Sequence, residues 1–256
     1  MATERRPTER GLIDLSVVVP AYNEGERIVP TLRRMRAYLA AQPYTSELIV
    51  VDDGSRDDTA AVARRELAGQ LEGQVISYRP NRGKGFAVRS GVAATRGARV
   101  LFTDADLSTP IEELERALPL LEQGNDLVVG SRAIGRVVVS QPLYRRLAAR
   151  FFNQVRKGLV GDIGVIDSQC GFKLFRGPVG RDIFGRQRID RFMFDVETLV
   201  VARNLGYRYV EMPVHWGDVP GSKVRVIHGA LELLPELLQI RLRHGHLTPK
   251  DARAQA

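Results

Sequence analysis

Two carboxylates separated by one residue, Asp104 and Asp106, directly follow the apolar run 100–103. Alternate residues of a strand point to the same side, so both carboxylates could bind one hard divalent cation, Mg²⁺ or Mn²⁺. Such a cation would bridge a diphosphate and neutralise the charge that develops on a leaving group. The alternative is a solvated acidic turn capped by Ser108 and Thr109. The position at the end of a buried strand favours the metal site.

Three further polar groups follow other predicted strands. The carboxylate of Asp53 could accept hydrogen bonds from a nucleobase or a ribose, although acidic residues in such places often cap the next helix. The segment 81–85 places Arg82 and Lys84 at a helix N-terminus, which suits a phosphate or a ribose as well as it suits a plain surface turn. Arg132 could make two parallel hydrogen bonds to a phosphate, or it could be an ordinary surface arginine.

The sequence lacks the glycine patterns of two large nucleotide-binding classes. The turn after the first predicted strand, residues 20–24, has no Gly-x-Gly, which argues against the pyrophosphate cradle of nicotinamide and flavin enzymes. No Gly-x-x-x-x-Gly-Lys-Ser/Thr pattern occurs, which argues against a P-loop kinase or ATPase. Cys170 is the only cysteine and the histidines are scattered, so a disulfide framework and a cysteine zinc site are excluded.

Apolar runs alternate with helical patterns through the first half of the chain. Predicted strands cover 15–20, 47–51, 75–78, 99–103 and 126–130, and predicted helices cover 25–40, 57–71, 85–95 and 110–123. Short apolar strands that alternate with helices indicate an α/β fold, with a mostly parallel sheet covered by helices on both faces. Ligands bind beyond the carboxyl ends of such strands, where the polar groups above are found.

The alternation breaks after residue 130. The later predicted elements are a basic helix over 143–159, strands over 172–175 and 207–214, and helices over 195–205 and 227–243. We expect one domain over 14–245, because single cores grow to roughly 250 residues. Its first part, 14–132, looks like a platform for a nucleotide, and its second, 133–245, like an elaboration that receives an acceptor. The ends, 1–13 and 246–256, are expected to be flexible.

The chain of 256 residues has a net charge of +8, which favours anionic partners. Residues 132–157 hold seven basic residues and no acidic one, so this stretch could lie on an anionic membrane surface or pack on the core with a solvated cationic face. A nucleic-acid partner is disfavoured, since no platform of stacking aromatic residues is evident and the paired carboxylates would repel phosphates. The broadly apolar last helix fits core packing, a homo-oligomer contact or a membrane contact.

The charged N-terminus, residues 1–10, lacks the apolar core of a signal peptide, and no window approaches the roughly 18 apolar residues of a spanning helix. Together with the single cysteine, this predicts a reducing, cytoplasmic location. Contact with the inner face of a membrane would then be peripheral.

Taken together, these segments resemble the inverting family 2 glycosyltransferases of the GT-A fold, and in particular the polyprenyl (dolichyl) phosphate sugar synthases. The matching segments are 17–24, 51–55, 83–85, 104–106, 130–132, 167–173 and 222–223. The resemblance implies a nucleotide-sugar donor, a polyprenyl phosphate acceptor and a GT-A fold. The segment 167–173 looks more like the dolichyl-phosphate glucose synthase branch, which favours UDP-glucose over GDP-mannose.

The resemblance also assigns roles to individual residues. Six residues should surround the nucleoside: Pro20, Ala21, Tyr22, Glu24, Val51 and Asp53. Asp104, Ala105 and Asp106 should hold the metal and the diphosphate, and Arg132 and Lys223 should attract the acceptor phosphate or the donor diphosphate. Mannose synthases of the family often have Gln as a metal contact two residues after the triplet, where this chain has Ser108.

These roles imply in-line attack of a phosphate oxygen on the anomeric carbon, with inversion and departure of a nucleoside diphosphate. A phosphate acceptor is already ionised near neutral pH, so no strong general base is required. A sugar or glycerate hydroxyl acceptor would instead need a carboxylate base, and Asp195 is the candidate for that role.

Overall fold

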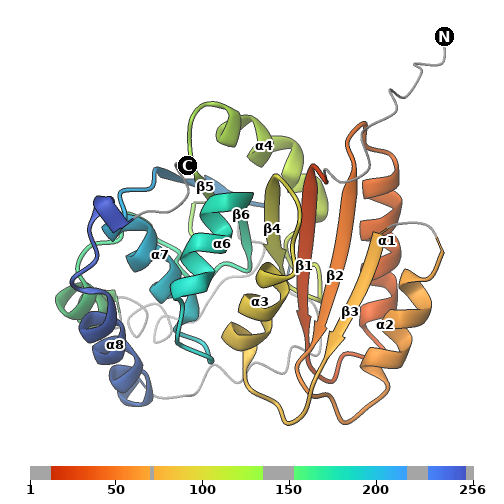
Figure 1. The fold of residues 1–256 in the computed structure, drawn as a ribbon, viewed down its shortest axis with the longest axis horizontal. Coiled ribbons are helices and arrows are strands. Elements are labelled where there is room, and N and C mark those ends of the chain that lie inside the picture. The colour runs from red at the N-terminus through yellow and green to blue at the C-terminus, as the bar shows by residue number, and fades with distance from the viewer. Residues whose placement is uncertain (1–12, 70–71, 135–152, 218–229, 252–256) are drawn as a thin grey trace.

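The computed structural model describes residues 13–69, 72–134, 153–217 and 230–251. One seven-stranded sheet crosses the molecule in the order β3-β2-β1-β4-β6-β5-β7 (Figure 1). The strands are β1 (Leu15–Ala21), β2 (Ser46–Asp52), β3 (Glu72–Ser77), β4 (Arg99–Thr103), β5 (Leu127–Ser131), β6 (Phe172–Arg176) and β7 (Tyr209–Pro213). Pairing is parallel except where β6 lies between β4 and β5, to both of which it is antiparallel. The predicted mostly parallel α/β sheet is confirmed.

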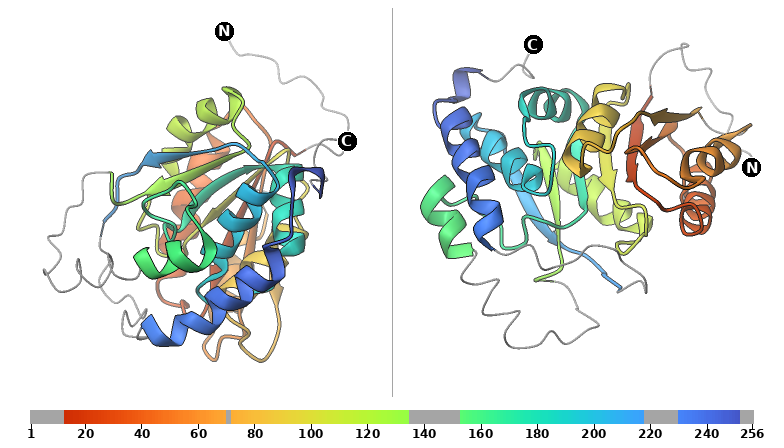
Figure 2. Two further views of the ribbon diagram at one scale, coloured as in Figure 1. Left: turned by 90° about the vertical axis from the view of Figure 1, so that its left-hand side faces the viewer. Right: turned by 90° about the horizontal axis from the view of Figure 1, so that it is seen from below.

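Helices cover both faces of the sheet (Figures 1 and 2). They are α1 (Ile28–Ala40), α2 (Thr59–Leu67), α3 (Lys84–Ala93), α4 (Leu114–Glu122), α6 (Gly177–Arg186), α7 (Phe194–Asn204) and α8 (Ala230–His244), with short 3₁₀ turns at Ile111–Glu113 and Pro249–Asp251. Residues 153–160 are also helical, and Leu159 accepts a hydrogen bond from Arg241 of α8.

Alternation along each strand divides the core into two layers. In β1, Val18 joins the layer that α3, α6, α7 and α8 cover, whereas Val17 and Val19 join the layer under α1, α2 and α4. Strands buried on both faces explain why the sequence shows continuous apolar runs here instead of alternating ones.

Several elements differ from their predicted extents. Helix α2 ends at Leu67 instead of residue 71, and β3 begins at Glu72, three residues earlier than predicted. Helix α6 was not predicted, because glycines at 177, 180 and 185 weaken its helical pattern. Residues 249–251, within the segment expected to be a flexible tail, form a 3₁₀ turn in which Asp251 accepts hydrogen bonds from Thr248.

The two functional parts predicted on either side of residue 132 are built into one sheet. Strand β6 comes from the second half of the chain, yet it pairs with β4 and β5 of the first half. Both halves therefore contribute to one sheet and one core.

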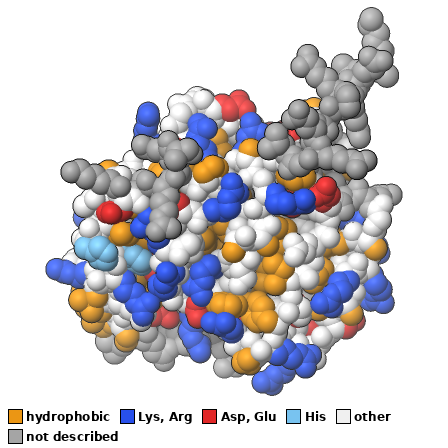
Figure 3. Space-filling model, in the orientation of Figure 1, with side chains coloured by type: hydrophobic (Ala, Val, Ile, Leu, Met, Phe, Trp, Pro, Cys, Tyr) orange, Lys and Arg blue, Asp and Glu red, His pale blue; other side chains and the backbone are white. Residues whose placement is uncertain are grey.

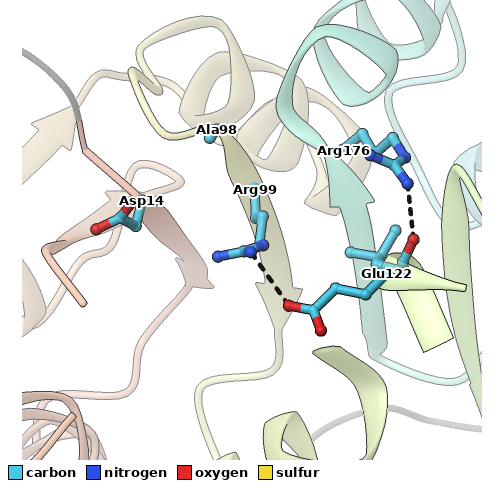
Figure 4. Close-up of a pocket in the computed structure, with 6 residues that line it drawn as sticks. Asp14, Ala98, Arg99, Glu122 and Arg176 are labelled. Atoms are coloured by element: carbon cyan, nitrogen blue, oxygen red, sulfur yellow. Dashed lines mark hydrogen bonds and ion pairs between the residues drawn. The ribbon is translucent and has the colours of Figure 1, made fainter. Parts of the chain in front are cut away.

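A shallow hollow opens at the amino edge of the sheet, near the start of β1 and β4 (Figure 4). Arg99 lies 3.4 Å from Glu122, and Arg176 donates a hydrogen bond to the backbone oxygen of Leu121 at 2.7 Å. These cations are held by acceptors of the protein, and ligands of such sheets bind at the opposite, carboxyl edge.

Candidate active site

The carboxyl ends of β1, β2, β4 and β5 lie along one edge of the sheet, as their parallel orientation requires. Strand β6 runs the other way, so its first residue, Phe172, lies opposite Thr103 at the end of β4. The edge therefore brings together most of the polar segments singled out in the sequence and adds the segment that leads into β6.

The Asp104-Ala105-Asp106 triplet forms a turn after β4 and does not continue the strand. The Asp104 amide donates to the backbone oxygen of Gly171 at 3.2 Å, and Leu107 has a positive φ of 50°. The amide of Ser108 donates to Asp106 Oδ1 at 2.9 Å. The prediction that strand alternation aligns the two carboxylates was wrong, because the chain turns at Asp104. Their proximity in this turn still permits a shared cation.

Lys84 contacts the first carboxylate of the triplet. Its Nζ lies 2.7 Å from Asp104 Oδ1 and 5.3 Å from the ring centroid of Phe102. Burial lowers the pKa of Lys84, but the negative charges of Asp104 and Asp195 outweigh burial, so the pKa lies above its ordinary value. Lys84 therefore remains a cation at the edge where a phosphate would bind.

A second ion pair lies deeper under the same phenylalanine ring. Lys173 of β6 is fully buried, and its Nζ lies 2.5 Å from Asp195 Oδ1 and 2.7 Å from the backbone oxygen of Cys170. Its distance to the Phe102 ring centroid is 5.8 Å. Both lysines therefore pair with a carboxylate and lie within about 6 Å of the Phe102 ring centroid.

Asp195, the predicted base for a hydroxyl acceptor, is only 3% exposed. Burial raises the pKa of its carboxyl, against the opposing effect of the ammonium groups of Lys173 and Lys84. A raised pKa alone would suit a general base, but a base must also reach the proton that it abstracts. Because Asp195 is buried and pairs with Lys173, its surroundings are those of a structural ion pair and not those of a general base.

The carboxylate of Asp53 organises the loop after β3. Its Oδ1 accepts hydrogen bonds from the Tyr78 hydroxyl and the Arg82 amide, at 2.9 and 2.8 Å. Its Oδ2 accepts from the Asn81 side chain and the Gly83 amide, at 2.7 and 2.9 Å. Each oxygen therefore already has two donors. Contact of this side chain with a nucleoside stays a prediction, and the structure gives Asp53 the role of shaping the loop that carries Lys84.

The remaining predicted nucleoside residues differ in accessibility. Pro20, Ala21 and Val51 are buried, so they could meet a nucleoside mainly through backbone atoms, whereas Tyr22 is 39% exposed. The Glu24 amide donates to Thr59 Oγ1 at 2.8 Å, and its carboxylate lies 2.6 Å from Arg27.

Arg132 forms a two-point ion pair within the protein. Its Nε and Nη2 donate to the two carboxylate oxygens of Asp167 at 2.7 and 2.8 Å, and its amide donates to Asp167 Oδ2 at 3.0 Å. Glu211 Oε1 in turn accepts the Asp167 amide at 2.8 Å. Burial raises the pKa of Asp167, but Arg132 outweighs it and holds that pKa below the ordinary value. The fork predicted to bind phosphate is thus engaged by Asp167.

The sequence of this chain matches known proteins over most of its length. The model of glycosyl transferase family 2 matches residues 16–184, a range that contains Lys84, the acidic turn and the Arg132–Asp167 pair. The chain belongs to glycosyl transferase family 2. This glycosyltransferase is 37% identical to a dolichyl-phosphate beta-glucosyltransferase of Trichomonas vaginalis over 91% of this chain and 73% of that relative. It is 35% identical to the human dolichyl-phosphate beta-glucosyltransferase over 90% of this chain and 75% of that relative.

Solved glycosyltransferases share the fold. The structure of glucosyl-3-phosphoglycerate synthase from Mycobacterium tuberculosis in complex with Mn²⁺, uridine diphosphate and glucosyl-3-phosphoglycerate superposes with a TM-score of 0.58 at 25% identity, over 91% of this chain and 80% of that one. Mannosyl-3-phosphoglycerate synthase from Rubrobacter xylanophilus gives a TM-score of 0.60 at 19% identity, over 91% of this chain and 72% of that one. The predicted GT-A fold and glycosyltransferase activity are confirmed.

The donor atoms of the acidic turn fit a divalent cation shared with a substrate. Asp104 and Asp106 offer carboxylate oxygens, which hard cations prefer, and the Asp104 side chain is about one-third exposed. Among the residues that the structure describes, no group of three or more His, Cys, Asp or Glu side chains could hold a metal alone. Mg²⁺ is commonly bound by one or two protein carboxylates together with phosphate oxygens of a substrate.

Three residues that support the site carry no signal in the sequence for their contacts: Glu113, Asp167 and Lys173. Asp167 and Lys173 belong to the segment 167–173 that resembles the family, but a resemblance does not give their partners. Glu113 is buried and accepts the amide of His215 at 3.0 Å, while the Gly217 amide donates to the Ser108 oxygen at 3.0 Å. These bonds tie the segment after β7 to the acidic turn.

Lys223 lies outside the described residues, as does most of the basic helix predicted over 143–159. Of that stretch the structure describes 153–159, where Arg156 is buried. The basic stretch was predicted either to lie on a membrane or to present a solvated cationic face. Arg156 is not part of such a solvated face, because it is buried.

Proposed function

We propose that this glycosyltransferase transfers glucose from UDP-glucose to a polyprenyl or dolichyl phosphate, with inversion at the anomeric carbon. The observation that carries the proposal is the similarity to curated dolichyl-phosphate beta-glucosyltransferases over about 90% of the chain. A relative bound to uridine diphosphate supports a uridine donor over a guanosine donor.

In the proposed reaction, an acceptor phosphate oxygen bonds to the anomeric carbon while the bond from that carbon to the diphosphate oxygen breaks. Asp104 and Asp106 would hold the divalent cation, which supplies positive charge to the departing diphosphate. Lys84 adds a second positive charge beside this position, at 2.7 Å from Asp104. The acceptor phosphate is ionised near neutral pH, so the proposal needs no deprotonated side chain to activate it.

A second candidate is transfer to a soluble hydroxyl acceptor, since similar structures are glucosyl-3-phosphoglycerate synthases. That chemistry would need a general base, and Asp195 is buried and paired with Lys173. The geometry therefore supports the phosphate acceptor better.

The deciding experiment supplies radiolabelled UDP-glucose or GDP-mannose with Mn²⁺ and either dolichyl phosphate or 3-phosphoglycerate. We expect labelled lipid only in the reaction that combines UDP-glucose with dolichyl phosphate. Labelled glycerate product without labelled lipid would refute the acceptor assignment, and lipid product from GDP-mannose only would refute the donor assignment.

We also propose peripheral contact with an anionic membrane through α8. Leu238 and Leu242, four residues apart on one helix face, are 47% and 80% exposed, and Arg241 and Arg243 flank Leu242. Basic side chains are spread over the face that includes α8 (Figure 3). None of the helices in the described part of the chain is long and apolar enough to cross a bilayer.

Sedimentation with vesicles that contain anionic lipid tests the membrane contact. Leu242→Glu should reduce the bound fraction, whereas Glu122→Gln, at a distant exposed position on α4, should not. Equal binding of wild type and Leu242→Glu would exclude α8 as the contact. Homo-oligomer formation stays a prediction of the sequence.

A further inference from the structure

Lys84 contacts a carboxylate that the proposed function assigns to a divalent cation. Its Nζ lies 2.7 Å from Asp104 Oδ1, and both side chains are about 30% exposed, so the contact lies at the open edge of the sheet. An ammonium group has three donors and no acceptor, so Lys84 cannot itself become a metal ligand. A cation that approaches Asp104 therefore meets a positive charge 2.7 Å from Oδ1, and the repulsion favours movement of the ammonium away from this carboxylate.

We propose that Lys84 and the divalent cation exchange at Asp104, and that the displaced Lys84 ammonium turns to the diphosphate of the sugar donor. This inference rests on the proposed function, because it takes Asp104 and Asp106 as the metal ligands. It adds that one lysine serves two successive anionic partners, first the carboxylate and then the diphosphate.

The backbone around Lys84 is held by hydrogen bonds, so a movement of its ammonium group has to come from rotation within the side chain. The Gly83 amide is bonded to Asp53 and the Phe86 amide donates to the backbone oxygen of Asp190 at 3.1 Å. A β-carbon on Gly83 would lie 2.4 Å from that same Asp190 oxygen, which shows how closely the two segments pack. The lysine stem of four methylenes then supplies the motion.

The Lys84 ammonium would still be attracted by a second carboxylate after it leaves Asp104. The charge of Asp195 acts on Lys84 as well as on Lys173, and only Asp195 Oδ1 accepts the Lys173 ammonium. The face of the Phe102 ring, 5.3 Å from Lys84 Nζ, offers a further favourable surface for a cation. A displaced ammonium therefore stays near the diphosphate position.

The exchange predicts that, without nucleotide, the divalent cation binds more weakly to the wild-type protein than to a variant that lacks the Lys84 ammonium group. It also predicts that cation and donor favour each other, since the cation frees Lys84 for the diphosphate. Ion pairs of this exposure are weak enough to be replaced by a doubly charged cation.

The direct test uses NMR of lysine ammonium groups during titration with Mg²⁺. The chain has only five lysines, at 84, 157, 173, 223 and 250, and Lys84→Arg assigns the Lys84 signal by its loss. We expect Mg²⁺ to move the Lys84 signal in the wild type and to leave it unchanged in Asp106→Asn. A Lys84 signal that stays constant while calorimetry shows Mg²⁺ binding would overturn the exchange and leave the proposed function intact.

Metal affinity supplies a second readout. Without nucleotide, Lys84→Met should bind Mn²⁺ about 3- to 10-fold more tightly than wild type, because the competing ammonium is gone. Lys157→Met is the matched control, since Lys157 also pairs with an aspartate at 2.7 Å but far along the chain from the triplet, and it should leave the affinity unchanged. If neither wild type nor Lys84→Met binds Mn²⁺ or Mg²⁺, with or without UDP, the metal site and the exchange both fail.

Discussion

A β-carbon on Gly171 would lie 1.9 Å from Asp104 Oδ2, far inside any non-bonded contact. Gly171 also accepts the Asp104 amide through its backbone oxygen, so the segment entering β6 and the acidic turn are packed directly together. The glycine is needed here for space, and it lies next to Asp104, one of the two proposed metal ligands.

Gly171→Ala should therefore lower the rate of glucosyl transfer by at least roughly 10-fold, since small misplacements of catalytic groups are costly. Asp104 is partly exposed and can move aside, so the melting temperature should change little. Rates and Mn²⁺ affinity measure the effect. Gly158→Ala serves as control, because a β-carbon there meets no atom within 4 Å; equal activity of both variants would contradict the argument.

Asp195→Asn distinguishes a structural carboxylate from a general base. We expect transfer to a phosphate acceptor to fall less than about 10-fold, whereas a general base would cost on the order of 10² to 10⁴. Stability should fall, because the buried ammonium of Lys173 loses its counter-ion, and breaking such a pair costs about 3–5 kcal/mol. Initial rates and urea unfolding test the two parts, and Lys173→Met combined with Asp195→Asn should recover part of the stability.

The Arg132–Asp167 pair predicts acid sensitivity. Since the pKa of Asp167 is lowered in the folded protein, the stability that the pair supplies is fully present above the unfolded value of about 3.9 and is lost as pH falls through the lower folded value. Asp167→Asn should flatten the pH dependence of unfolding below about pH 4. Urea unfolding of both proteins across this range is the measurement, and parallel curves would show that the pair contributes nothing.

The single cysteine should be unreactive in the folded protein. Burial raises the pKa of Cys170 to about 11, so the thiol is protonated near neutral pH, and its side chain is fully buried. Iodoacetamide at pH 8 should leave native protein unlabelled and should add one group per chain in denaturant. Rapid labelling of native protein would mean that the segment entering β6 opens readily.

Local patterns were sufficient for the first half of the fold. Continuous apolar runs such as 15–20 predict strands buried on both faces, and the confirmed sheet has helices on both sides. The same patterns placed Asp104, Asp106 and Lys84 at strand and helix ends, because the ends of parallel strands meet at one edge.

Sequence patterns alone predict the family, the kind of sheet and which polar groups stand at its edge. Which of these groups pair with each other follows from the tertiary fold. The insertion of β6 between β4 and β5 brings Lys173 under Phe102 beside Asp195, and it sets Gly171 against Asp104. Asp167 holds Arg132 across 35 residues of sequence. Such pairings depend on how distant segments pack across the sheet, and the periodicity of a single segment carries no information about its neighbour.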